Sequence, residues 1–180
     1  KQYVNNDPVK AMDYTRQALE LATAINDPSG MASSYNNIGV LFKNRGSLDE
    51  ALDNYLQSVR IQEENKFVDA LPYTYNNIGT IYSLKSEFEK ALEYFNKALA
   101  QFESIDHKLR IIGTLNNIGN VYSDLEEYDY ALTYYLKSLT IYEEMEDNSQ
   151  AFIPFNNIGN MYFKKGELDN ALAFYESGYD

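Results

Sequence analysis

Cysteine and tryptophan are absent from this 180-residue chain, and histidine occurs once. Without cysteine the chain has no disulfide, no thiolate metal ligand and no cysteine nucleophile, although this absence does not fix the compartment. The single histidine, His107, has no cysteine or second histidine with which to bind a metal. We expect it to be exposed near the start of a helix, where it acts at most as a cap.

Basic residues are also scarce, with 15 Lys and Arg against 27 Asp and Glu, so the net charge is −12. We expect no nucleic-acid partner, because phosphate binding needs an excess of basic side chains. No apolar run approaches the ~20 residues of a membrane span, and no signal peptide is visible. We therefore expect no direct membrane insertion and favour a cytoplasmic location, with a periplasmic sensor region as the alternative.

Acidic residues are concentrated between Asp124 and Asp147, where eight of them stand against one base, Lys137. The simple interpretation is a solvated outer face that aids solubility. The alternatives are a docking surface for a partner with basic flanks, or a cation site. A calcium loop needs alternating acids with a glycine turn, which this stretch lacks, so we expect no metal and no cofactor.

What the chain does contain is a four-residue motif, Asn-Asn-Ile-Gly, that occurs four times. The copies begin at Asn36, Asn76, Asn116 and Asn156, a constant spacing of 40 residues. A fixed period between about 20 and 50 residues is typical of repeat proteins. An aromatic residue follows each glycine by three positions, an alanine by twelve and a second aromatic by sixteen, as in Phe42, Ala51 and Tyr55.

These positions predict two helices in each repeat. In the first, Tyr35, Ile38 and Phe42 are three or four residues apart and form one apolar stripe, and a second stripe starts at Leu48 and Ala51. A glycine inside a helix costs about 1 kcal/mol relative to alanine, so its return in every first helix needs a packing reason. We predict that the paired helices approach closely at Gly39, Gly79, Gly119 and Gly159.

Local signals predict where the helices begin. Asp27, which precedes a proline, is predicted to be the N-cap of a helix. Ser47 together with Glu50 predicts a capping box for the following helix. Pro72 is expected in the first turn of a helix, where a missing N–H does little harm. Pro154 comes later in its repeat and is expected to delay the start of its helix or to kink it.

The order of aromatic or apolar residue, Ile-Gly, aromatic, alanine, aromatic and small residue resembles the tetratricopeptide repeat. The common unit of that family has 34 residues, whereas this unit has 40 and lacks the usual proline near the end of its second helix. Longer units with paired asparagines resemble those of kinesin-light-chain-like adaptors and of bacterial sensors and peptide receptors. The resemblance implies an all-α, right-handed superhelical solenoid of helix-turn-helix repeats.

Extended along the chain, the pattern predicts a single array, residues 1–180, of about four and a half repeats. Residues 1–26 are a half repeat, residues 27–66, 67–106 and 107–146 are full repeats, and residues 147–180 are a truncated last repeat. Ala171, Leu172 and Tyr175 would then lie on a helix with nothing packed after it, and self-association through the open ends is one expectation.

The asparagine pairs are the one polar feature that the apolar stripes do not explain. Asparagine is a middling helix former, but its carboxamide both donates and accepts hydrogen bonds, so a ladder of them can pair with the backbone of an extended peptide. In the resembled family the first helices line a concave groove and the second asparagine of such pairs contacts the peptide. By matching position, the resemblance assigns this role to Asn37, Asn77, Asn117 and Asn157.

The first asparagine of each pair either joins this groove or bonds a neighbouring helix and fixes the stacking of repeats. These residues are Asn36, Asn76, Asn116 and Asn156. Specificity is expected from the variable neighbours Val40, Tyr73, Thr80, Asn120, Asn160 and Phe163. The chaperone-tail clamp of some relatives is disfavoured, because its basic positions are here Asn36, Tyr73, Gly113 and Ile153.

The predicted function is therefore protein–protein interaction, through an extended peptide or partner segment held in the groove, and not catalysis. Two alternatives stay open. The chain is a sensor or regulatory region of a larger bacterial signalling protein, such as a histidine kinase or transcription regulator, or it is a self-assembling scaffold without a separate ligand.

Overall fold

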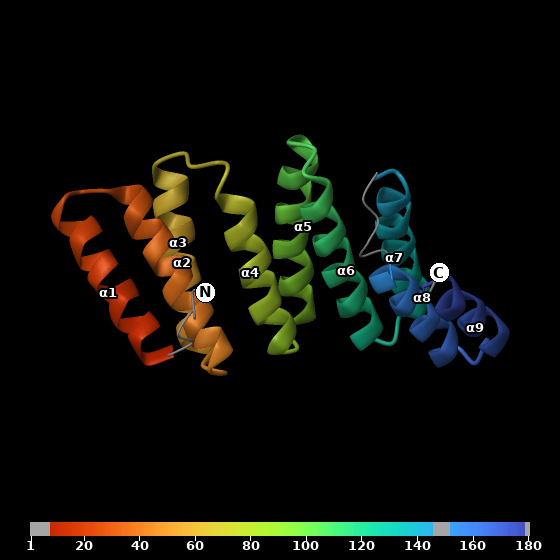
Figure 1. Ribbon diagram of the computed structural model, residues 1–180. Coiled ribbons are helices and arrows are strands. Elements are labelled where there is room, and N and C mark those ends of the chain that lie inside the picture. The colour runs from red at the N-terminus through yellow and green to blue at the C-terminus, as the bar shows by residue number, and fades with distance from the viewer. Residues whose placement is uncertain (1–7, 146–151, 179–180) are drawn as a thin grey trace, which may run out of the picture. The chain divides into compact units, whose positions relative to one another are not determined.

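The computed structural model describes residues 8–145 and 152–178, and every regular element in that part of the chain is an α-helix, which confirms the predicted all-α class. Figure 1 shows these helices, coloured by their order along the chain. They are α1 (Pro8–Ala24), α2 (Pro28–Asn44), α3 (Leu48–Glu64), α4 (Leu71–Leu84), α5 (Phe88–Ser104), α6 (Lys108–Asp124), α7 (Tyr128–Glu143), α8 (Phe152–Lys164) and α9 (Leu168–Ser177).

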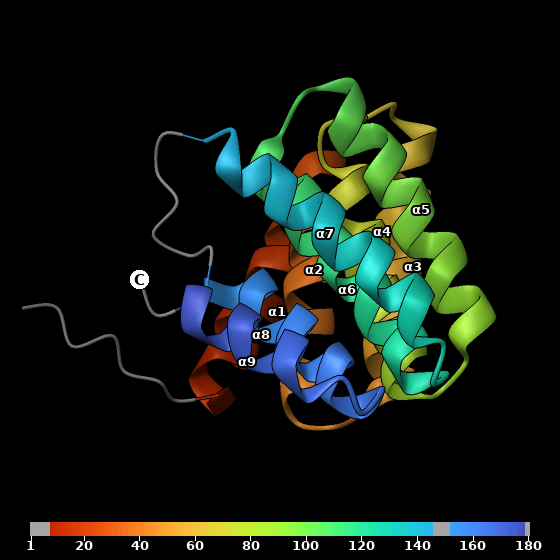
Figure 2. The same cartoon turned by 90° about the vertical axis from the view of Figure 1, so that its right-hand side faces the viewer.

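The helices belong to two compact units, which are described separately. Unit 1, Lys1–Glu87, contains α1 to α4, and each of these packs against the next along the chain. Unit 2, Phe88–Asp180, contains α5 to α9 with the same sequential packing, and Figure 2 shows α7, α8 and α9 at its near side. The repeat boundaries predicted from the sequence, and the single array they define, stay predictions.

The repeated glycines lie under aromatic rings. An added Cβ atom would lie 2.7 Å from Cε1 of Tyr55 at Gly39, and 2.6 Å from the corresponding tyrosine at Gly119 and Gly159. The prediction of close helix approach is confirmed at these three glycines. The tyrosine of the second helix is what fills the space beside each one, so the glycine makes room for a ring rather than for another backbone.

Helices α2 and α3 begin where the sequence predicts, but their N-cap side chains make no cap hydrogen bond. Asp27 and Ser47 occupy the N-cap positions of α2 and α3, yet neither side chain makes a cap hydrogen bond. The capping-box prediction is therefore wrong. Ser47 has ψ 76°, outside the extended conformation of a capping residue, because its N–H donates back to the carbonyl of Phe42 at 3.0 Å and closes the turn.

The turn between the two helices of a repeat needs a left-handed residue. Positive φ angles of 79° and 80° occur at Gly46 and Gly166, where glycine accepts them freely. The equivalent positions are Ser86 and Glu126, with φ of 58° and 61°. A side chain at a left-handed position costs about 1–2 kcal/mol, so these two turns are strained relative to the glycine turns.

Three further predictions concern the ends of helices and can be compared with the structure. Pro72 lies in the first turn of α4, as predicted. Pro154 lies in the first turn of α8, which begins at Phe152, and the predicted start of that repeat near Asp147 is outside the described residues. In α9, Leu172 is 57% exposed but Ala171 is buried, so only part of the predicted open face is apolar and exposed.

Candidate functional site

The four Asn-Asn-Ile-Gly motifs lie within α2, α4, α6 and α8. In each copy the isoleucine and the glycine are buried, while the asparagines are half-buried, except for Asn37, which is exposed. The pairs thus lie at the edge of the packed face. From this position an asparagine can bond a neighbouring helix and still reach solvent.

In unit 1 the two asparagine pairs are bonded to each other. Nδ2 of Asn77 in α4 donates to Oδ1 of Asn36 in α2 at 3.1 Å. The bond joins the second asparagine of one motif to the first asparagine of the motif before it. Asn77 therefore stabilises the packing of the first helices, whatever else it contacts, and its carboxamide retains further hydrogen-bonding capacity.

In unit 2 the first asparagine of α6 is tied to the second helix of its own repeat. Oγ of the buried Ser138 in α7 donates to Oδ1 of Asn116 at 2.9 Å and also lies 2.8 Å from the carbonyl oxygen of Tyr135. A first asparagine again has a structural partner. The remaining asparagines of the motif are half-buried: Asn76, Asn117, Asn156 and Asn157.

Tyrosine hydroxyls from the second helices donate hydrogen bonds to the asparagines at two of the predicted specificity positions. Tyr135 Oη donates to Oδ1 of Asn120 at 2.6 Å, and Tyr175 Oη donates to Oδ1 of Asn160 at 2.7 Å. Burial, with a smaller contribution from the charge of Asp124, raises the pKa of Tyr135 well above its usual range. The family resemblance implies a groove that includes Asn120 and Asn160, but the sequence gives no signal of these tyrosine partners.

The first repeat has the same tyrosine without the asparagine. Val40 occupies the position of Asn120, and Tyr55, which is fully buried, has no hydrogen-bond partner for its hydroxyl among the described residues. Burial raises the pKa of Tyr55 to about 12. A buried hydroxyl without a partner costs about 1–3 kcal/mol. The hydrogen-bonding groups of this repeat are therefore less completely paired than those of the repeats in unit 2.

The other predicted specificity residues are partly accessible. Tyr73 and Thr80 in α4 are half-buried, and the Thr80 hydroxyl donates to the carbonyl of Asn76 at 3.0 Å. Phe163 in α8 is 61% exposed. An exposed phenylalanine beside polar groups offers an apolar contact to a bound chain.

A pocket of about 300 Å³ lies between α6 and α8 in unit 2. Its lining residues come from these two helices and from α7, and they are Asn120, Ser123, Tyr135, Asn157, Asn160, Met161, Phe163 and Lys164. Four of them, Asn120, Asn157, Asn160 and Phe163, are predicted peptide-binding residues. The structure thus brings together predicted site residues from two successive motifs.

Lys164 brings a positive charge to this pocket, which the sequence prediction did not include. Its Nζ donates to Oγ of Ser123 at 2.9 Å and lies 5.5 Å from the ring centre of Tyr128. Lys164 is exposed, and its ammonium contacts both α6 and the Tyr128 ring of α7. The periodic pattern of the sequence could not reveal it, because the equivalent positions in earlier motifs are Asn44, Leu84 and Asp124.

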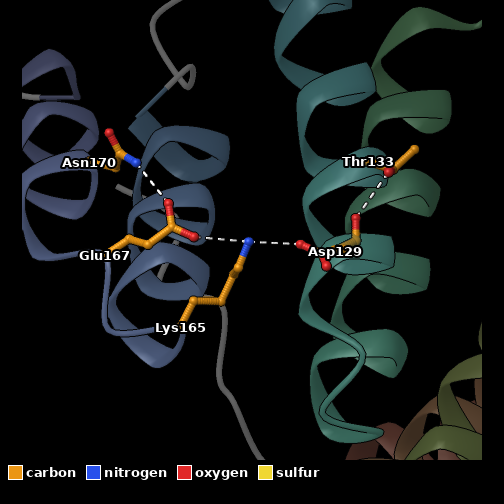
Figure 3. Close-up of polar contacts among 5 residues, drawn as sticks. All are labelled: Asp129, Thr133, Lys165, Glu167 and Asn170. Carbon is orange, nitrogen blue, oxygen red and sulfur yellow. Dashed lines mark hydrogen bonds and ion pairs between the residues drawn. The ribbon is translucent and has the colours of Figure 1, made fainter.

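The acidic stretch of the third repeat is partly paired by lysines from neighbouring helices. Lys165 Nζ lies 2.8 Å from Asp129 and 3.0 Å from Glu167, and Asn170 donates to Glu167 at 2.8 Å, as Figure 3 shows. In the same view the Thr133 hydroxyl donates to the Asp129 carbonyl. These contacts raise the pKa of Lys165 and lower that of Glu167, in both cases chiefly through the hydrogen bonds of the lysine.

A similar lysine occurs in unit 1. Lys85 Nζ lies 2.5 Å from Asp49 and 3.5 Å from Glu87. Both lysines are in the turn that precedes a second helix, and both reach back 36 residues to the second helix before it. Leu125 stands at the equivalent place in the third repeat and is 39% exposed. Part of the acidic surface therefore serves to join successive repeats.

The environment of His107 differs from the exposed position that the sequence predicts. It lies at the N-cap position of α6 without a side-chain cap bond, and it is half-buried, with its ring 6.0 Å from that of Phe102 in an edge-on arrangement. The expectation of an exposed histidine is wrong, because the ring packs on the end of the preceding helix. No group of three or more His, Asp or Glu side chains suited to a metal occurs among residues 8–145 and 152–178.

No helix in the described ranges is long and apolar enough to cross a membrane. The fold is that of helix-turn-helix repeats, with glycine and tyrosine packing in the pairs α2–α3, α6–α7 and α8–α9. Polar contacts join the first helices α2 and α4 in unit 1, and α6 and α8 in unit 2. This arrangement defines a class of helical repeat proteins. The comparisons with known proteins identify the family.

The tetratricopeptide repeat family model matches residues 30–104, 70–144 and 110–180. The chain therefore belongs to the tetratricopeptide repeat family, as the sequence predicts. Among curated proteins, no sequence matches this chain.

Solved structures of similar fold include BtubC (BKLC) from P. vanneervenii, at 26% identity and a TM-score of 0.89, covering 97% of this chain and 72% of that one. The apo form of RapI has 19% identity and a TM-score of 0.82, covering 95% of this chain and 48% of that one. PH0952 from Pyrococcus horikoshii is a signal transduction ATPase with a tetratricopeptide repeat sensor. It has 18% identity and a TM-score of 0.82, covering 98% of this chain and 28% of that one. The predicted solenoid class of tetratricopeptide repeats is thereby confirmed, and the family indicates a protein-interaction scaffold.

Proposed function

We propose that this chain binds an extended peptide segment of a partner protein on its first helices, at α6 and α8 in unit 2. The observation that carries the proposal is the pocket between α6 and α8, which is lined by Asn120, Asn157, Asn160 and Phe163. Asn157 is assigned to the site by the family resemblance, and Asn120, Asn160 and Phe163 are the variable neighbours expected to give specificity. Their convergence on one hollow surface supports the peptide-binding assignment.

The chemistry of the pocket suits an extended chain. Its carboxamides exchange hydrogen bonds with backbone N–H and C=O groups, which any peptide offers regardless of its side chains. Phe163 and Met161 provide the apolar surface for one side chain of the ligand. In unit 1 the corresponding contacts would come from Asn37, Asn77 and Val40. Binding rather than catalysis is the role proposed for all of these residues.

A peptide selection followed by affinity measurements would identify a ligand and test the site. The chain would first be used to select binders from a library of displayed random peptides, and the affinity of a selected synthetic peptide would then be measured by calorimetry. The double variant Asn157→Ala with Phe163→Ala should weaken binding roughly tenfold or more, since it removes a hydrogen bond and an apolar contact.

A matched double variant controls for nonspecific effects. Asn96→Ala with Tyr14→Ala also removes one carboxamide and one exposed ring, but neither Asn96 on α5 nor Tyr14 on α1 lines the pocket. Its affinity should equal that of the parent chain, and both variants should keep their melting temperatures within a few degrees. Equal losses in the two variants, or no loss in the pocket variant, would refute the proposed site.

A further inference from the structure

Two asparagines of the α6–α8 pocket have a fixed orientation. Oδ1 of Asn120 accepts the hydroxyl of Tyr135 at 2.6 Å, and Oδ1 of Asn160 accepts the hydroxyl of Tyr175 at 2.7 Å. Both asparagines are exposed residues. When the oxygen of a carboxamide is held inward by a phenol, its NH₂ group is the part that faces the ligand.

The tyrosines can hold these oxygens only as hydroxyl donors. Tyr135 is 2% exposed, and burial raises its pKa, so its phenol keeps the proton at all pH values near neutrality. The phenol hydroxyl donates its hydrogen to Oδ1 of Asn120 in a part-buried hydrogen bond. If this carboxamide turned its oxygen outward, its NH₂ group would face the phenol, and the phenol hydrogen would lose this acceptor. The orientation of Asn120 is therefore set by α7.

Three acceptor atoms of the pocket already have a hydrogen-bond partner. Oγ of Ser123 accepts the ammonium of Lys164 at 2.9 Å, as the two asparagine oxygens accept the tyrosines. The polar groups that remain toward a ligand are the NH₂ groups of Asn120 and Asn160, the ammonium of Lys164 and the carboxamide of Asn157. Of these, three can only donate.

We propose that Tyr135 and Tyr175 are positioning residues that make this pocket a donor site, and that it takes the side-chain carboxylate of an Asp or Glu in the bound peptide. The neighbouring apolar side chain of that peptide packs on Met161 and Phe163. This inference rests on the proposed function and adds to it a preferred ligand chemistry, one opposite in sign to the basic flanks expected from the acidic composition.

The local charge favours this occupant. Lys164 is the one charged residue among those that line the pocket. Lys165, its neighbour in sequence, is engaged elsewhere with Asp129 and Glu167, as Figure 3 shows. Asp124 is close enough for its charge to act on Tyr135, but it does not line the pocket. A side-chain carboxylate, unlike a terminal one, allows the peptide to continue past the pocket along α6.

The test uses ¹⁵N-labelled chain and four synthetic hexapeptides followed by NMR. Three are acetylated and amidated, and carry Leu followed by Asp, Asn or Lys, while the fourth carries Asn and a free terminal carboxylate. The Asp peptide should shift the side-chain NH₂ signals of Asn120 and Asn160 and bind about three- to tenfold more tightly than the Asn peptide. The Lys peptide should bind more weakly than either.

Variants separate the charge from the orientation. Lys164→Gln should abolish the preference for the Asp peptide, whereas Lys165→Gln, the same change one residue away, should retain it. Tyr135→Phe should reduce the preference at an unchanged net charge, because Asn120 is then free to turn its oxygen toward the ligand. A merely structural role of Tyr135 would lower stability and leave the ratio of the two affinities unchanged, which would overturn its positioning role.

The remaining outcomes distinguish this inference from the proposed function. Equal shifts of the pocket signals with the Asp, Asn and Lys peptides would overturn the donor site and leave peptide binding intact. Tighter binding of the free-carboxylate peptide than of the Asp peptide would overturn the side-chain assignment. No shift of any pocket signal with any peptide would overturn both the inference and the proposed function.

Discussion

The same substitution, tyrosine to phenylalanine, should have opposite effects at two equivalent positions of this chain. The hydroxyl of Tyr55 is buried and has no partner in the part of the chain that the structure describes, while that of Tyr135 donates to Asn120 at 2.6 Å. Removing an unsatisfied buried hydroxyl relieves part of a desolvation cost of about 1–3 kcal/mol, and removing a bonded one loses a net ~0.5–1.5 kcal/mol. We expect Tyr55→Phe to stabilise the chain by about 1 kcal/mol and Tyr135→Phe to destabilise it by a similar amount.

Urea unfolding followed by far-ultraviolet circular dichroism would measure the difference, with Val40→Asn as a third variant that offers Tyr55 the missing acceptor. Alkaline pH gives an independent readout. Burial raises the pKa of Tyr55 to about 12, above the ~10 of an unfolded tyrosine. The stability from its protonated form is therefore present below pH ~10 and lost as the pH rises toward about 12, and Tyr55→Phe should reduce that loss. A destabilised Tyr55→Phe would refute the reasoning, since it would mean that the hydroxyl has a partner.

Three further substitutions test the packing of the repeats. Gly119→Leu should cost on the order of 1–3 kcal/mol or more, because even a Cβ atom there would lie 2.6 Å from Tyr135; an unchanged melting temperature would contradict the contact. Glu126→Gly should stabilise by about 0.5–1 kcal/mol, since φ is 61° at this position, and the gain should appear as a higher urea midpoint. Leu125→Lys should add a bridge to Glu127 worth about 0.2–1 kcal/mol at low salt, and a gain that persists in molar salt would argue against an ionic origin.

The fold was predictable from the sequence because its strongest signal is periodic. A motif that returns every 40 residues places equivalent side chains at equivalent points, so one apolar stripe, such as that of Tyr35, Ile38 and Phe42, predicts the helices of all repeats. The glycine at the helix crossing was predictable for the same reason. Its cost in a helix requires compensation, and the compensation is the tyrosine ring that lies over it.

What the sequence could not predict lies in the departures from the period. The partner of Asn116 is Ser138 and the partner of Asn36 is Asn77, so equivalent asparagines bond different groups. These choices depend on side-chain geometry between helices, which spacing does not encode. The Ser47 capping box failed for a related reason, because the backbone of the turn already satisfies the groups that the side chain would have capped.

The distance along the chain between bonded residues has a consequence for biosynthesis. The hydrogen bonds from Asn77 to Asn36 and from Lys164 to Ser123 each span 41 residues, and the lysine bridges span 36. Closing a loop of this length costs less chain entropy than closing a longer one. These contacts therefore form between neighbouring parts of the sequence and do not need distant parts. As the polypeptide leaves the ribosome, a newly made helix can thus pack on the helices made just before it. Little apolar surface then stays exposed until later residues are synthesised.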